Sequence, residues 1–89
     1  DRVLETALEI ARDMVINCSP LVMGMHKRLL WQGLDMGREA LVEWETRALH
    51  DTLSRADAME GGMAFFERRS PRWTTNVPRD WPADLMDGD

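Results

Sequence analysis

The first part of the chain alternates apolar and polar residues with the period of an α-helix. Between positions 3 and 15 the apolar residues recur every three or four positions: Leu4, Ala7, Leu8, Ala11, Met14 and Val15. This spacing places them on one face of an amphipathic helix. We predict that the helix ends near Asn17, because Ser19 can act as an N-cap and Pro20 can begin the next helix.

Two further helices are predicted downstream. The second, from Pro20 to about Trp31, begins with an almost continuous apolar run, so it should be buried on several sides. Residues 33–37, which begin and end with glycine, interrupt the pattern, and a third helix is predicted from about Met36 to Leu53. The apolar stripe of this third helix consists of Ala40, Leu41, Trp44, Ala48 and Leu49.

A fourth helical segment is predicted after residues 54–57, where the sequence SRAD resembles a capping box. Gly61 and Gly62 should interrupt this segment, since glycine costs about 1 kcal/mol relative to alanine inside a helix. The helix should resume from Met63 to Arg69, and Pro71 prevents it from continuing.

The residues after position 73 contain two prolines, four aspartates and no apolar periodicity. Such a segment is ordered only if Trp81 and Leu85 find a surface to pack on. The sequence therefore predicts an all-α fold: a cluster of about four helices over residues 1–73, followed by an irregular acidic tail over residues 74–89.

The composition of the chain limits the kinds of molecule that it could bind and the cellular compartment in which we expect it. The formal net charge of -5 argues against a nucleic-acid or anionic-membrane binder, since both need a cationic surface. Cys18 is the only cysteine, which excludes an internal disulfide and favours a reducing compartment. No apolar run could span a bilayer, and no signal segment begins the chain. We therefore expect a soluble, cytoplasmic protein. The start at Asp1, already within a helical pattern, suggests a segment of a longer protein.

The sequence indicates no catalytic or metal-binding residue. A nucleophile needs a base within hydrogen-bond reach, and neither His26 nor His50 shares a helix face with Cys18 or a suitable serine. The two histidines also lack the spacing of paired metal ligands. A Cys18 thiol at a helix start could be reactive, but we favour the simpler interpretation of a small residue packed at a tight turn between helices.

The sequence MAFFERRSPRW (residues 63–73) combines adjacent phenylalanines with arginines at a helix end. Phe65 and Phe66 point about 100° apart on a helix, so we expect one ring to pack within its own domain and the other to contact a surface outside it. Arg68, Arg69 and Arg72 either complement the helix dipole on a solvated face or form a site for a phosphate or carboxylate.

These residues resemble the C-terminal part of the enoyl-CoA hydratase/isomerase (crotonase) family. The densest match to the family's ending consists of Asp57, Glu60, Gly61, Ala64, Phe65, Glu67, Arg69, Pro71 and Trp73. Upstream, Ser19-Pro20, Lys27 and Glu45 stand where the family places S-P, a lysine and a glutamate. The resemblance extends from about Leu4 to Trp73.

The resemblance implies a helical region that builds a homo-oligomer, a trimer or a hexamer, and completes the coenzyme A site of a neighbouring subunit. Arg68 replaces the family lysine that reaches the CoA phosphate, and Phe65 is the family's aromatic residue beside the acyl or CoA channel. The family's oxyanion-hole amides and catalytic carboxylates belong to an upstream region, so this segment alone should be inactive. No cofactor is implied, since coenzyme A is part of the substrate.

The resemblance thus predicts part of an acyl-CoA enzyme of fatty acid metabolism, with enoyl-CoA hydratase, a lyase, as the leading assignment and isomerase as a related one. Water would add across the double bond of a 2-enoyl-CoA. The alternative is a free-standing, non-catalytic helical interaction module derived from the same family. A small helical ligand binder is a third interpretation, which would require a self-contained pocket with converging polar groups.

Overall fold

The computed structural model describes residues 2–87 of the chain. Within this range the chain forms six helices and no β-strand: α1 (Arg2–Asn17), α2 (Pro20–Gly33), α3 (Arg38–Leu53), α4 (Asp57–Phe66), α5 (Val77–Asp80) and α6 (Ala83–Met86). The all-α prediction is confirmed. Helices α1 to α3 begin and end within about two residues of their predicted bounds.

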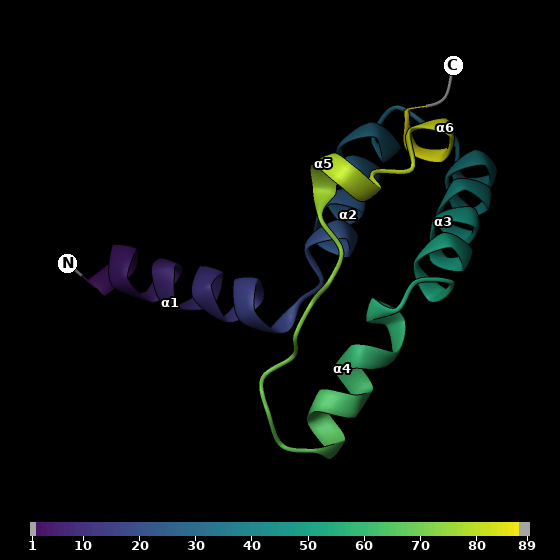
Figure 1. The fold of residues 1–89 in the computed structure, drawn as a ribbon. Coiled ribbons are helices and arrows are strands. Elements are labelled where there is room, and N and C mark those ends of the chain that lie inside the picture. The colour runs from purple at the N-terminus through teal and green to yellow at the C-terminus, as the bar shows by residue number, and fades with distance from the viewer. Residues whose placement is uncertain (1, 88–89) are drawn as a thin grey trace.

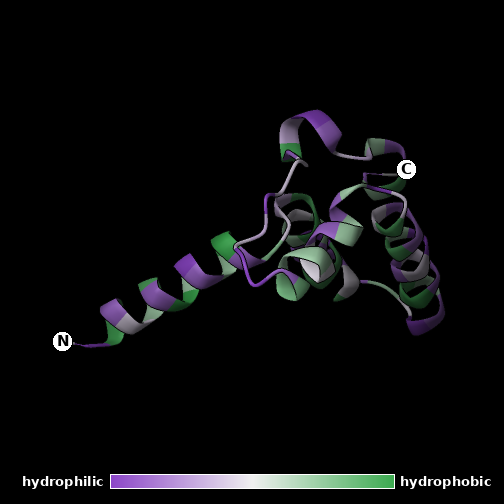
Figure 2. Ribbon diagram, turned by 60° about the horizontal axis from the view of Figure 1, so that its bottom comes forward, coloured by the Kyte–Doolittle hydropathy of each residue, from purple (hydrophilic) through white to green (hydrophobic). Residues whose placement is uncertain are grey.

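Helix α1 projects away from the remaining helices (Figure 1). The predicted amphipathic pattern is present, with apolar and polar bands alternating along α1 in Figure 2, but none of its side chains is buried. The radius of gyration of 15.0 Å reflects this projection, since a compact chain of this length would have about 12 Å. The apolar face of α1 therefore lies uncovered in this chain.

Helices α2 and α3 form the core together with the end of the chain. The buried apolar side chains are Leu21, Met25 and Leu29 of α2, Ala48 of α3 and Met86 of α6. Four partly buried apolar side chains pack around them: Leu41, Trp44, Trp81 and Leu85. The predicted stripe of α3 is thus correct at three positions, whereas Ala40 and Leu49 are exposed.

The C-terminal segment runs back from α4 along α2 and α3 (Figure 1). Asn76 caps α5 by accepting a hydrogen bond from the Arg79 amide at 3.1 Å. The Trp44 indole donates to the Leu85 carbonyl at 2.9 Å. The surface that the tail was expected to require for Trp81 and Leu85 therefore exists, and Met86, at 2% exposure, completes the core.

Helix α4 differs from its prediction in three respects. It is continuous through Gly61 and Gly62, and it ends at Phe66 instead of Arg69. Its N-cap is Ala56 without a side-chain hydrogen bond, and the Ser54 hydroxyl instead donates to the Asp51 carbonyl at 2.6 Å. The predicted capping box was therefore wrong.

The continuity of α4 has a tertiary cause. A Cβ atom at Gly61 would lie 3.4 Å from Cη2 of Trp73, so the returning chain packs directly on this glycine. Contacts of this kind outweigh the roughly 1 kcal/mol by which each glycine disfavours a helix. At Gly62 a Cβ atom would meet nothing within 4 Å, which leaves an open surface beside Phe65 and Phe66.

Candidate functional site

Asp57 at the start of α4 clasps the returning chain. Its Oδ1 accepts hydrogen bonds from the amide and hydroxyl of Thr74, at 2.8 and 2.9 Å. Its Oδ2 accepts from the amide and hydroxyl of Thr75, at 2.9 and 2.6 Å. The Ser19 hydroxyl also donates to Oδ2 at 3.4 Å and lies 3.0 Å from the Thr75 hydroxyl. The Asp57 clasp therefore joins the starts of α2 and α4 to the segment before α5.

The environment of Asp57 stabilises its ionised form. Burial alone would raise the pKa of this carboxyl, which is 7% exposed. The Thr75 hydroxyl, the amides of Thr74 and Thr75 and the Thr74 hydroxyl outweigh burial and lower the pKa to about 2. A carboxylate with this pKa, fully occupied by donors, is a structural anchor and is unsuited to general acid–base chemistry at neutral pH.

Ser19 occupies the predicted N-cap position of α2, but its side chain has a different role. Its backbone is extended, with φ of -60° and ψ of 129°, and its carbonyl accepts from the Met23 amide at 3.0 Å. The hydroxyl makes no capping hydrogen bond, because it points toward Asp57 and Thr75 instead. The sequence therefore predicted the position of Ser19 before α2 but gave no sign of its contact with Asp57.

Glu60, one turn after Asp57, clasps the chain at a second point. Its carboxylate accepts from Arg69 Nη1 at 2.5 Å and from the Arg72 amide at 2.9 Å. The hydrogen bonds from Arg69 and Arg72 lower the pKa of Glu60. Arg69 also donates from Nε to Glu67 at 2.8 Å, so its guanidinium is shared between two carboxylates. Arg69 therefore stabilises the turn after α4 through these two ion pairs, and its guanidinium is not available to bind an external anion.

Arg68 is placed differently from its neighbour. It has a φ of 56° and is the only non-glycine residue with positive φ among residues 2–87. Its amide donates to the Phe65 carbonyl at 3.2 Å, and the Arg69 amide donates to the Ala64 carbonyl at 3.0 Å. These two bonds define a Schellman motif, which usually has glycine at the left-handed position. Among the described residues the Arg68 side chain has no hydrogen-bond or ion-pair partner.

The two phenylalanines are both exposed, Phe65 by 86% and Phe66 by 87%. The expectation that one ring packs within its own domain was therefore wrong. Helix α4 buries only Asp57 and Ala64, and both phenylalanines lie on its remaining surface. Phe65 and Arg68 thus both lie at the exposed end of α4, three positions apart in the sequence.

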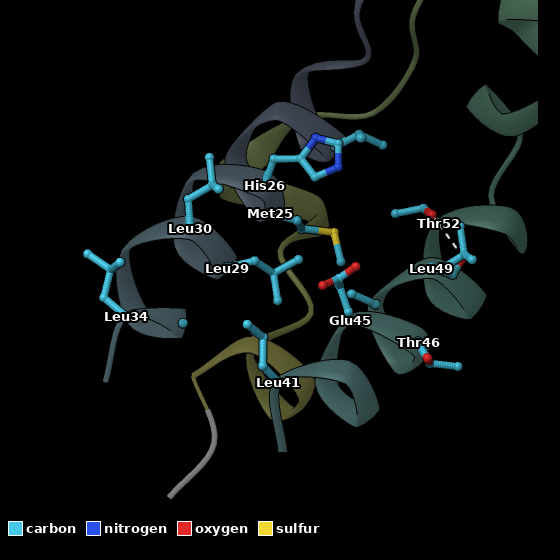
Figure 3. A pocket seen from close by; sticks show the side chains of 13 residues that line it. Met25, His26, Leu29, Leu30, Leu34, Leu41, Glu45, Thr46, Leu49 and Thr52 are labelled. Atoms are coloured by element: carbon cyan, nitrogen blue, oxygen red, sulfur yellow. Dashed lines mark hydrogen bonds between the residues drawn. The ribbon is translucent and has the colours of Figure 1, made fainter. Parts of the chain in front are cut away.

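An apolar groove of about 690 Å³ lies between α2 and α3. Figure 3 shows leucine side chains from both helices along it, including Leu29 and Leu41. The polar groups at the groove are the His26 imidazole, the Glu45 carboxylate and the hydroxyls of Thr46 and Thr52. Among the described residues, no hydrogen bond or ion pair joins His26 to Glu45, so these two side chains do not form an acid–base pair. The groove is an open apolar surface between two core helices.

The described residues contain no arrangement suited to a metal ion, since no three His, Cys, Asp or Glu side chains among them gather at one place. Between residues 2 and 87, none of the helices combines the length and apolar character needed to cross a membrane.

Comparison with known proteins gives a consistent result. No family model matches the chain. The carnitinyl-CoA dehydratases of Proteus mirabilis (strain HI4320) and Proteus sp. (strain LE138) are each 31% identical over 78 residues, which cover 79% of this chain and 28% of each relative. The crystal structure of a probable enoyl-CoA hydratase/isomerase from Mycobacterium abscessus superimposes with a TM-score of 0.78 at 35% identity, covering 84% of this chain and 30% of that one.

The chain belongs to the enoyl-CoA hydratase/isomerase (crotonase) family. It spans less than a third of the length of these relatives. In this family member the motif residues Asp57, Glu60 and Arg69 hold the segment that follows α4 and returns along the helix. The resemblance pointed to these residues, but their structural role depends on Thr74 and Thr75, which no local pattern indicated, and on the backbone amide of Arg72, which the sequence indicated only for its side-chain charge.

Proposed function

We propose that this chain is the C-terminal, assembly-forming region of an acyl-CoA enzyme, and that the parent protein is an enoyl-CoA hydratase. The observation that carries the proposal is the 31% identity over 78 residues to dehydratases that act on a CoA thioester. Hydration and dehydration are the two directions of one reaction. In the hydration direction, the oxygen of water bonds to the β-carbon and a proton bonds to the α-carbon of the 2-enoyl-CoA.

The uncovered apolar surfaces support an assembly role. The face of α1, the groove between α2 and α3 and the two phenylalanines of α4 are exposed at the same time. Monomeric soluble proteins rarely leave apolar patches of this extent uncovered. We therefore propose that other parts of the parent protein or neighbouring subunits cover these surfaces in a homo-oligomer.

The position of Arg68 supports a role in binding coenzyme A. A guanidinium suits a phosphate group through paired hydrogen bonds, and the Arg68 side chain is exposed and unpaired among residues 2–87. The neighbouring Arg69 is already bound to Glu60 and Glu67. Of the two adjacent arginines, only Arg68 is available to a CoA phosphate at an adjacent subunit.

The proposal is tested on the natural protein that contains the sequence of residues 59–69. We expect an intact mass several times 10.3 kDa and loss of the enoyl thioester when the protein is supplied with a 2-enoyl-CoA. The 89-residue chain alone should show no turnover. A natural protein of only about 10.3 kDa would instead support the second candidate, a free-standing interaction module. The same exposed apolar surfaces favour that candidate.

Arg68→Gly separates the backbone at this position from its side chain. In the isolated chain we expect the free energy of unfolding to rise by up to about 1 kcal/mol, because glycine adopts a left-handed conformation without the cost that other residues incur. In the parent protein we expect CoA affinity to fall about tenfold or more through loss of a charge-assisted phosphate contact. The measurements are urea denaturation and CoA titration, with Arg38→Gly at an exposed helix start as the control. Unchanged CoA affinity would remove the assignment of Arg68.

Phe65→Ala tests whether the Phe65 ring, which is exposed in this chain, is buried at an interface in the parent protein. In the isolated chain the free energy of unfolding should change by less than about 0.5 kcal/mol, because the ring is 86% exposed. In the parent oligomer we expect a loss of about 3–5 kcal/mol in subunit association or substrate binding if the ring is buried there. Sedimentation and CoA titration of the parent measure the two effects. An oligomer and a CoA affinity that are both unaltered would show that Phe65 contacts neither.

A further inference from the structure

The C-terminal residues 77–87, here called the strap, form a separate cover over α2 and α3. Helix α5 contacts α2, and α6 contacts α3 (Figure 1). Within the strap only Met86 is fully buried. The strap thus adds Met86 to the buried core and packs Trp81 and Leu85 around it, and its Leu85 carbonyl accepts a hydrogen bond from the Trp44 indole at 2.9 Å.

One polar cluster, here called the latch, fixes the far end of the strap. The Arg28 guanidinium pairs with the Asp87 carboxylate and lies 5.2 Å from the centroid of the Trp81 ring. The Trp81 indole N–H donates to the other oxygen of Asp87 at 3.1 Å. All three side chains are partly accessible to solvent, so the latch is open to water and salt.

Gly24 of α2 shows how closely the strap approaches. A Cβ atom at this position would lie 3.3 Å from Cγ2 of Val77 and 3.4 Å from Cζ3 of Trp81. Glycine is unfavourable inside a helix, and here its lack of a side chain allows the strap to lie against the α2 backbone. A larger residue at position 24 would therefore displace the strap without touching the buried face of α2.

The near end of the strap is held more firmly. The preceding residues, Thr74 and Thr75, are bound to the buried carboxylate of Asp57. The hydrogen bonds inside α2 and α3 do not involve the strap, so they can persist without it. We propose that the strap opens and closes on the α2–α3 pair as a unit, without unfolding of the other helices. It is hinged at the Asp57 clasp and held shut by the latch together with the burial of Met86 and the hydrogen bond from Trp44. Opening uncovers the apolar surface of α2 and α3 that Met86 covers.

Amide hydrogen exchange on the full 89-residue chain tests the proposal. The reporters in the strap are the amides of Trp81 and Asp87, which are bonded to Val77 and Ala83. We expect these amides to exchange at least about tenfold faster than the slowest amides of α2 and α3, as in a locally opening unit. Equal rates in all three elements would overturn the proposal, because they would indicate one cooperative unit.

Asp87→Asn weakens the latch, and Asp84→Asn removes the same charge from the strap at a carboxylate without a partner among the described residues. Asp87→Asn should speed exchange of the strap amides about fivefold, the effect of losing a partly exposed ion pair, and leave α2 and α3 unchanged. Asp84→Asn should change neither. No effect of Asp87→Asn on the strap, or an equal effect on α2 and α3, would contradict the proposal.

Gly24→Leu supplies an independent check at the other contact. We expect it to remove protection from the strap amides while the amides of α2 and α3 remain protected. A strap that stays protected in Gly24→Leu would show that close approach to α2 does not hold it, and the proposal would fail.

Discussion

Asp57→Ala is expected to lower the free energy of unfolding by about 3–5 kcal/mol. The substitution removes a buried carboxylate and leaves the amides and hydroxyls of the exposed Thr74 and the half-buried Thr75 without their acceptor. It also releases the connection between α4 and the segment before α5. Urea denaturation followed by circular dichroism measures the loss.

Asp84→Ala is the matched control for Asp57→Ala, since it removes an exposed aspartate that has no partner among the described residues. We expect a change below about 0.5 kcal/mol there. If Asp57→Ala prevents folding, Thr75→Val provides a milder version by removing one hydroxyl donor. A loss below 1 kcal/mol for Asp57→Ala would mean that the clasp contributes little to stability.

The same clasp predicts a dependence of stability on pH. The pKa of Asp57 is lowered from its ordinary value of 3.8 to about 2 in the folded chain, so the folded state favours the ionised form. The contribution is therefore complete above about pH 4 and is lost as the pH falls toward 2. Each unit of pKa corresponds to about 1.4 kcal/mol, which gives a loss of about 2 kcal/mol. In Asp57→Ala this acid-dependent loss should disappear.

Leu21→Ala is the second substitution with a large expected effect. Leu21 is 0% exposed and lies in the core with Met25 and Met86. Truncation of a fully buried leucine costs about 2–5 kcal/mol, through lost burial and the cavity that remains. Leu30→Ala on the same helix is the control, since Leu30 is 73% exposed. Thermal and urea denaturation of both variants measure the difference, and similar losses for the two would contradict the described core.

The first three helices could be predicted because their signals are local. Apolar periodicity, Pro20 after Ser19 and the glycines at positions 33 and 37 act over a few residues, and α1 to α3 follow them. The predicted break at Gly61 failed because Trp73 packs on that glycine. Trp73 lies twelve positions downstream, beyond the range of a local helix propensity.

The candidate site could be predicted only in part, for a similar reason. The resemblance pointed to Phe65 and Arg68 as residues, but the left-handed backbone at Arg68 was not foreseen, because glycine usually marks that position of a Schellman motif. The clasp of Asp57 joins residues seventeen or more positions apart, among them Thr75 and Ser19. Thr74 and Thr75 looked like part of an ordinary polar loop.

Helix α1 has a consequence for how an assembly of this chain can be detected. It has 16 residues and no buried side chain, so tertiary packing contributes little to its helical state. Helices of about this length are only marginally stable in water on their own. Whatever covers the apolar face of α1 must therefore also stabilise its backbone, and binding and helix formation become one coupled equilibrium. The helicity of α1 would then report directly on the fraction of chains whose partner surface is in place.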